Sequence, residues 1–271
     1  MRAGFLLFAV LFAPDALAWG LQTHVFLAQW TLAAIPLADP QFRAAALRLP
    51  RLVLAGACLP DLALAGRMLG LTTFRRAHQW STLRRLAAAC WDEERAIAVG
   101  YASHLLADVV AHNRFVPEHE RRIFDVPHVT HALCEWAMDE HLKKGLTMAP
   151  ADVLDCESHT LAQAAARTFS CRETLARRVV LFLGRAERTL RASRLPRLCG
   201  GAMRLLQGNT AVAFDAYMSE ARGSIKQMDA VLGGAVPRWQ PEPGPEENQA
   251  IAKDAPAMSA PSAPPAITSL G

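Results

Sequence analysis

Residues 100–112 read GYASHLLADVVAH, and this stretch decides how the chain folds. Its polar residues His104, Asp108 and His112 stand four positions apart, and apolar residues fill the positions between them. At about 100° per residue, each step of four drifts by only about 40°, so a helix would project all three side chains from one face. The stretch therefore predicts an α-helix with three chemically active side chains on one side.

The rest of the chain has the same helical spacing of apolar residues, and no sustained alternation of period two marks a strand. The sequence predicts an all-α, compact multi-helix domain over residues 19–234. The expected helices span residues 22–35, 40–55, 80–90, 92–113, 128–144, 151–168, 171–192 and 197–232.

The first 18 residues are typical of a secretory signal peptide. They hold one positive charge at Arg2, an apolar run over residues 4–13 and the small-residue end Ala-Leu-Ala over residues 16–18. We expect cleavage before Trp19 and a secreted or periplasmic mature protein. Retention of the leader as an anchor is the alternative.

The other end of the chain is rich in proline and alanine. Eight of the 17 prolines fall in residues 237–271, where apolar side chains are sparse. We expect residues 235–271 to be a disordered tail, because such a composition buries little apolar surface.

Charge and cysteine content restrict the function further. A net charge of +4 over 271 residues predicts no nucleic-acid partner on charge alone, and nothing in the sequence points to a specific protein partner. Six cysteines in an exported chain permit disulfides but do not say which residues pair. None stands in a Cys-x-x-Cys pair, so a metal would depend on histidine and carboxylate ligands.

A second segment repeats the histidine–carboxylate spacing. His131 and Glu135 are four residues apart, and Asp139 follows one turn later. Burying several charges on two otherwise apolar helices is costly unless the charges are paired or bound to metal. The two segments together predict a metal centre, although either one alone is more simply explained by ordinary core or surface histidines.

Cleavage before Trp19 would supply further ligands. The α-amine and carbonyl oxygen of Trp19 can chelate a metal, and an amine pKa of about 7.7–8.0 lets a metal displace the proton at little cost. His24 follows five residues later. Asp61 and His78 lie between this terminus and the central motif. Taken singly, Asp61 is explained as a helix cap and His78 as a solvated residue.

In this order the motifs resemble the zinc-dependent phospholipase C family, whose fold the S1/P1-type single-strand nucleases share. The resemblance covers residues 19–140 and rests on Trp-Gly-x3-His, Gly-x3-Pro-Asp, a lone histidine, His-x3-Asp with a further histidine, and His-x3-Glu. It implies up to three Zn2+ ions. The implied ligands are Asp61, His78, His104 and Asp108 for the first ion, His112, His131 and Glu135 for the second, and Trp19, His24 and the bridging Asp108 for the third.

Two positions separate this chain from the best-known phospholipases and nucleases of that fold. In those proteins the third residue of the central motif follows the aspartate by six positions, but here that position is Arg114, and His112 must take the role. The second motif ends in Glu135, which favours the phospholipase branch over the nuclease branch. His128 is an alternative to His131. The remaining histidines are expected to be surface or capping residues: His119, His141 and His159.

The resemblance implies a secreted zinc-dependent phosphodiesterase of phospholipase C type, which hydrolyses phospholipid head groups or another phosphodiester with a zinc-bound hydroxide. The same resemblance implies that Asp61 acts as the general base. One alternative is a single-strand nuclease, with Trp80, Phe74 and Trp136 as candidates for base stacking. Another is a catalytically silent, metal-stabilised helical module.

The expected helix 171–192 combines six arginines with an apolar face of Leu175, Val179, Phe182 and Ala186. A solvated arginine face is the usual explanation of such a pattern. Peripheral contact with an anionic membrane is the alternative.

Overall fold

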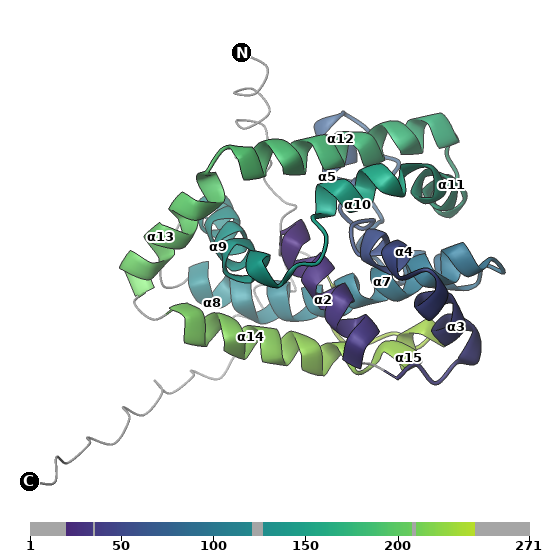
Figure 1. The fold of residues 1–271 in the computed structure, drawn as a ribbon, viewed down its shortest axis with the longest axis horizontal. Helices are drawn as coiled ribbons and strands as arrows, with labels where there is room; N and C mark the ends of the chain where they lie inside the picture. The colour runs from purple at the N-terminus through teal and green to yellow at the C-terminus, as the bar shows by residue number, and fades with distance from the viewer. Residues whose placement is uncertain (1–19, 35, 121–126, 208–209, 242–271) are drawn as a thin grey trace, which may run out of the picture.

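The computed structural model describes residues 20–34, 36–120, 127–207 and 210–241, without the side chains of residues 120, 127–131 and 207. Helices form every regular element of this part of the chain, which contains no strand (Figure 1). The predicted all-α fold is therefore confirmed. The leader, Trp19 and residues 242–271 lie outside the described residues, so their predicted roles stay predictions.

In chain order the elements are α2 (Leu21–Ala34), α3 (Pro40–Arg48), α4 (Pro50–Gly56), α5 (Leu62–Met68), α6 (Trp80–Ala87), α7 (Asp92–Val110), the π-helix η1 (Ala111–Phe115), α8 (Val116–Glu120), α9 (Pro127–Leu142), the 3-10 turn η2 (Lys143–Gly145), α10 (Pro150–Cys156), α11 (Ser158–Phe169), α12 (Glu173–Ala192), α13 (Leu195–Gln207), α14 (Thr210–Ile225) and α15 (Met228–Leu232).

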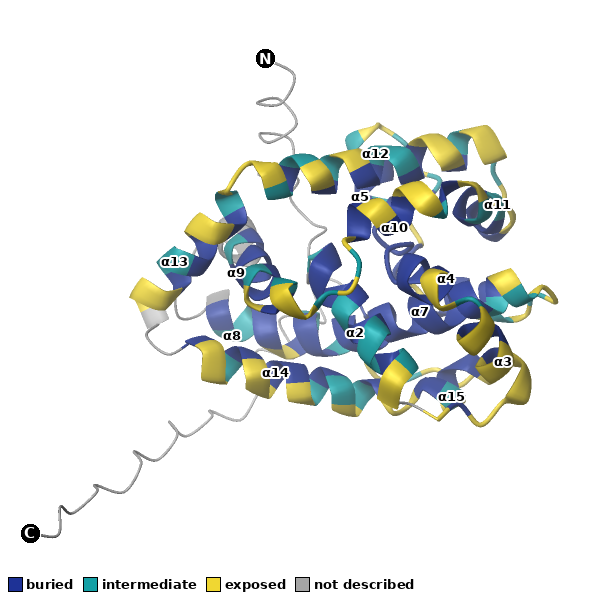
Figure 2. Cartoon of the chain, in the orientation of Figure 1, coloured by how far each residue is buried: buried dark blue, intermediate teal, exposed yellow. Residues whose placement is uncertain are grey.

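The helix α7 runs through the middle of the molecule and is buried over most of its length (Figure 2). It packs against α2, α3, α4, α6, α14 and α15. Around this centre, α9 packs on α13 and α8, while α12 packs on α10, α11 and α5. Polar side chains on α7 are therefore held in the interior, where an uncompensated charge is costly.

The backbones of α4 and α7 meet at two glycines. A Cβ atom added at Gly100 would overlap the carbonyl oxygen of Val53 and lie 2.8 Å from the amide nitrogen of Ala57. One added at Gly56 would lie 2.8 Å from the Cα atom of Ile97. Only glycine fits at both positions, so the two helices approach more closely than side chains would allow.

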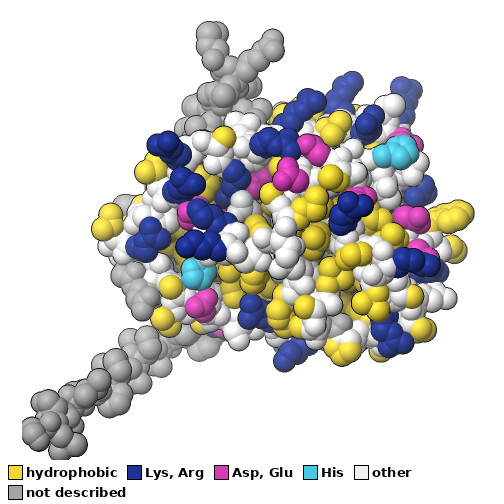
Figure 3. Space-filling model, in the orientation of Figure 1, with side chains coloured by type: hydrophobic (Ala, Val, Ile, Leu, Met, Phe, Trp, Pro, Cys, Tyr) yellow, Lys and Arg dark blue, Asp and Glu magenta, His cyan; other side chains and the backbone are white. Residues whose placement is uncertain are grey.

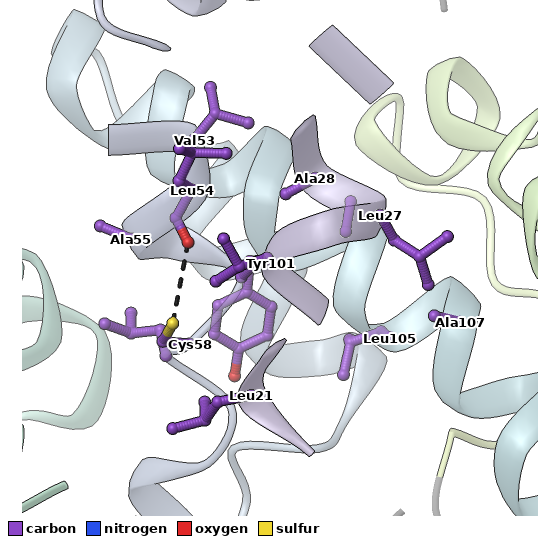
Figure 4. Close-up of a cluster of buried hydrophobic side chains, with 14 of the residues drawn as sticks. Leu21, Leu27, Ala28, Val53, Leu54, Ala55, Cys58, Tyr101, Leu105 and Ala107 are labelled. Atoms are coloured by element: carbon purple, nitrogen blue, oxygen red, sulfur yellow. Dashed lines mark hydrogen bonds between the residues drawn. The ribbon is translucent and has the colours of Figure 1, made fainter. Parts of the chain in front are cut away.

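Apolar side chains from three helices fill the space beside this crossing. Figure 4 shows Leu27 of α2, Val53 of α4, and Tyr101 and Leu105 of α7 in one buried cluster. The thiol of Cys58 donates to the carbonyl oxygen of Leu54, 3.8 Å away, within the same cluster. This packing fixes α2 and α4 relative to α7.

Three helices that the apolar spacing predicted as continuous are divided, one of them by a proline. The expected helix 40–55 is two helices, α3 and α4, because Pro50 has no amide hydrogen and forces Leu49 out of helical geometry, to φ −125° and ψ 54°. The expected helix 151–168 also divides, into α10 and α11, and 197–232 into α13, α14 and α15, although no proline lies at these breaks. The short helices α5 and α8 were not predicted.

The expected helix 171–192 forms as α12, and its apolar side is covered by the protein itself. Val179 and Leu183 are buried in the core. Arg188 pairs with Asp155 at 2.8 Å on the surface. Leu175, Phe182 and Ala186 are half-buried. The structure therefore agrees with an ordinary amphipathic surface helix that packs its apolar side on the core. No helix of the described residues is long and apolar enough to cross a bilayer.

The first residues of the proline-rich tail pack on the helical domain. The indole nitrogen of Trp80 donates to the backbone carbonyl oxygen of Trp239 at 3.2 Å. The side-chain amide of Asn113 donates to the backbone carbonyl oxygen of Gln240 at 3.1 Å. Cys58, Cys90, Cys156, Cys171 and Cys199 are free thiols.

Candidate metal centre

His104 and Asp108 lie one turn apart on α7 with both side chains buried. The His104 Nδ1 atom is 2.7 Å from the carbonyl oxygen of Ala57, which can only accept a hydrogen bond, so Nδ1 carries the proton. Its Nε2 atom then presents a lone pair, 2.8 Å from Asp108 Oδ2. A histidine held in this way by a backbone carbonyl is oriented as a metal ligand.

His78 reaches the same point from the turn before α6. The Tyr101 hydroxyl of α7 donates to the carbonyl oxygen of Ala77, and this bond holds the turn against the central helix. The His78 Nε2 atom lies 3.2 Å from His104 Nε2 and 3.5 Å from Asp108 Oδ2. Two imidazole nitrogens and a carboxylate oxygen therefore converge.

Asp61 completes this group at the start of α5. Its Oδ1 atom lies 3.7 Å from His78 Nε2. Although it holds the N-cap position of α5, its side chain makes no capping hydrogen bond within the described structure. The capping explanation of Asp61 is therefore wrong. The pKa of Asp61 is raised to about 7, because burial and the charge of Asp108 raise it by more than His104 lowers it.

His24 of α2 approaches Asp108 from the other side. Its Nε2 atom is 3.3 Å from Asp108 Oδ1, and its ring stacks on His104 with centroids 3.6 Å apart. The two oxygens of Asp108 thus face different histidines. Among the described residues, two sets of three side chains each have all their donor atoms within 4.8 Å of one another. One set is His24, His104 and Asp108, and the other is Asp61, His78 and His104.

This donor set fits zinc. Imidazole nitrogen and carboxylate oxygen are common zinc ligands. Burial raises the pKa of the Asp61 carboxyl, so a cation would compensate the charge that its ionised form places in the interior.

A family model described as zinc-dependent phospholipase C matches residues 23–178. The chain belongs to the zinc-dependent phospholipase C family. Curated proteins and solved structures gave no significant match. The matched region contains every described member of the two groups around Asp108. Membership of the family implies a hydrolase that acts on phosphodiesters.

The ligand set that the resemblance assigned to the second zinc is only partly visible in this member of the family. Glu135 is fully buried on α9, and burial raises its pKa well above the usual value. His112 is half-buried in η1. The side chain of His131 lies outside the described residues, as does Trp19 of the third set. These assignments stay predictions.

One of the remaining histidines was placed wrongly. His119 is 1% exposed, not at the surface, and packs against the rings of Phe115, Phe214 and Tyr217. Its Nδ1 atom lies 2.7 Å from the carbonyl oxygen of Phe115. His141 and His159 are exposed, as predicted. The apolar spacing gave no signal for His119 because two of its three ring neighbours, Phe214 and Tyr217, come from α14.

A pocket of about 60 Å³ opens beside Asp61 and Glu135. Apolar side chains of three helices dominate its wall: Leu64, Met68, Trp136, Phe182, Leu183 and Leu190. Arg191 and Glu187 also line it, and they bond to one another at 2.7 Å. The pocket therefore offers an apolar wall next to the carboxylates.

Asp139 holds the start of α2. Its Oδ1 atom accepts hydrogen bonds from the Thr23 amide at 2.9 Å and the Thr23 hydroxyl at 2.8 Å, so it caps α2 from another helix. Gly20 packs directly on this carboxylate, with no room for a Cβ atom. Arg191 donates to Asp139 Oδ2. Helical spacing alone assigns Asp139 no role, because its partners are far away in the chain.

We expect Asp139→Ala to lower the free energy of unfolding by about 3 kcal/mol, because it removes a buried ion pair and a helix cap. Urea denaturation followed by circular dichroism measures the loss. Asp155→Ala is the matched control, because Asp155 pairs at the surface with Arg188, which lies on α12 as Arg191 does. Loss of this exposed pair should cost less than about 1 kcal/mol. Equal losses in the two variants would contradict the role of Asp139.

Proposed function

We propose that this protein is an exported zinc-dependent phosphodiesterase that hydrolyses phospholipids in the phospholipase C manner. The observation that carries the proposal is the buried convergence of three histidines and two aspartates, in which Asp108 Oδ1 lies 3.3 Å from His24 and Oδ2 lies 2.8 Å from His104. A carboxylate placed in this way suits a bridge between two ions. His24, Asp61, His78, His104 and Asp108 are the proposed zinc ligands.

Zinc bound by such ligands polarises a phosphoryl group and lowers the pKa of water toward neutrality. The side chains of the site would supply the rest. Asp61, which lines the pocket, would accept the proton of the attacking water at a carboxylate oxygen. Ala57 would keep the Nδ1 proton on His104 through its carbonyl oxygen, so that the Nε2 lone pair stays directed into the site.

The lining of the pocket supports a lipid substrate over a single-stranded nucleic acid. All three aromatic residues considered for base stacking are buried, Phe74 at 0%, Trp80 at 4% and Trp136 at 3% exposure. Trp136 does line the pocket, but beside Phe182 and mostly aliphatic side chains. The positive charge of Arg191 is shared by Asp139 and Glu187, which leaves little attraction for a polyanion.

The test is a direct comparison of substrates with the purified, zinc-loaded mature protein. We expect release of the phosphorylated head group and diacylglycerol from phosphatidylcholine, and no cleavage of single-stranded DNA. Asp61→Asn should lose the lipid activity. Preferential cleavage of DNA would replace the proposal by the nuclease alternative, and full zinc occupancy without hydrolysis of either substrate would favour the catalytically silent module.

The proposed third ion depends on a free amine at Trp19. Adding one alanine before Trp19 should remove about one zinc ion per chain and most of the activity, because the displaced amine can no longer chelate. Elemental analysis of the purified protein measures the zinc. Trp19→Phe is the control, since it keeps both the amine and the carbonyl oxygen. Equal zinc content in the extended and native proteins would rule out the chelate.

A further inference from the structure

The helix α13 has apolar residues on two opposite sides. Its inner side buries Pro196, Cys199 and Met203. On its outer side Leu198 is 67% exposed and Leu205 is 90% exposed. These two leucines are seven residues apart and therefore lie on one face of the helix, two turns from each other.

Leu206 of α13 is also exposed, at 51%, but it lies seven residues after the buried Cys199 and therefore belongs to the inner side of the helix. We call Leu198 and Leu205 the outer apolar patch. Single exposed leucines are ordinary on a soluble protein, but two on one helix face, bordered by arginines as here, indicate an interaction site.

Exposed arginines border this patch. Arg197 and Arg204 are also seven residues apart, so they form a row beside the leucines, and Arg194 precedes the helix. Arg197 Nε lies 4.0 Å from Glu140 Oε1, and the Arg197 side chain stays 68% exposed. Hydrophobic and basic side chains lie together at the end of the molecule where α13 lies, with a few acidic side chains among them (Figure 3).

We propose that the outer apolar patch and its arginine row dock on the surface of an anionic lipid bilayer. Leucines that enter the boundary between head groups and acyl chains, next to arginines that contact anionic head groups, are the chemistry of an interfacial helix. The patch differs from the apolar side of α12, which the protein itself covers.

The docking face connects to the pocket through packed side chains. Cys199 on the inner side of α13 belongs to the same buried cluster as Trp136 and Leu190. Both Trp136 and Leu190 line the pocket beside Asp61 and Glu135. A bilayer that contacts the outer side of α13 would therefore be separated by this helix from the side chains that line the pocket. The inference rests on the proposed function for its lipid substrate, but the docking itself requires no catalysis.

Vesicle binding tests the inference without any turnover. We expect the protein to sediment with vesicles of phosphatidylcholine and phosphatidylglycerol in equal parts, and more weakly with phosphatidylcholine alone. Leu198→Ser with Leu205→Ser, and separately Arg197→Glu with Arg204→Glu, should each weaken binding on the order of tenfold or more. Leu47→Ser is the control, because Leu47 is 71% exposed on α3 and lies outside the patch.

Hydrolysis of a short-chain phosphatidylcholine below its micelle concentration separates the two proposals. The leucine variant should keep this activity and lose vesicle binding. Wild-type vesicle binding without hydrolysis would end the proposed function and leave the docking intact. Unchanged vesicle binding in the leucine variant would overturn the docking, as would a wild-type dimer that the leucine variant converts to a monomer, since the patch would then be an interface between copies.

Discussion

Replacing Asp108 by alanine should remove more zinc from the protein than replacing His24 by alanine. Asp108 Oδ1 lies 3.3 Å from His24 Nε2, and Asp108 Oδ2 lies 2.8 Å from His104 Nε2. A carboxylate between two ion sites serves both ions, whereas His24 serves one. The larger loss follows because a site left with too few protein ligands holds zinc poorly.

Elemental analysis of both variants gives the zinc content per chain, and thermal unfolding with and without a chelator gives a second measure. Ligand binding stabilises the folded state, so a chelator should lower the melting temperature of the wild type and have little effect on Asp108→Ala. Asp152→Ala, at an exposed carboxylate of α10, is the control and should behave as the wild type. More zinc in Asp108→Ala than in His24→Ala would refute the bridging role.

Much of the centre could be predicted because its spacing is local. The four-residue step from His104 to Asp108 specifies one helix face, and the structure places both side chains in the interior. His78 and Asp61 carry no such signal, since neither lies in a repeated pattern. Only the order of the motifs in the family resemblance assigned them to the predicted metal ligands.

The features that could not be predicted from the sequence depend on contacts between distant segments. Asp139 caps α2 across 116 positions of sequence, and Tyr101 holds the turn before His78 across 24. Helical periodicity describes one segment at a time and cannot show which segments meet. The division of the expected helix 40–55 is different, because Pro50 itself carried that signal.

The glycine crossing of α4 and α7 is the feature on which the geometry of the centre depends most. It brings the carbonyl oxygen of Ala57 within 2.7 Å of His104 Nδ1, and Asp61 follows four residues after Ala57. Widening the crossing would move the histidine's hydrogen-bond partner and the Asp61 carboxylate together. A single methyl group at Gly100 would do so.

We therefore expect Gly100→Ala to lower the free energy of unfolding by about 4 kcal/mol or more. The added Cβ atom would lie 2.8 Å from the amide nitrogen of Ala57, and backbone atoms cannot turn aside as a flexible side chain can. Alanine's better helix propensity returns only about 1 kcal/mol, so the overlap dominates.

Urea denaturation and zinc content of the same samples measure both consequences of Gly100→Ala. Gly223→Ala in α14 is the matched control, because a Cβ atom there meets nothing within 4 Å and the change should be neutral or stabilising by up to about 1 kcal/mol. If Gly100→Ala is too insoluble to purify, pulse proteolysis in cell lysate can still compare its stability with that of Gly223→Ala. A Gly100→Ala protein as stable and as zinc-rich as the control would show that the close crossing does not position the centre.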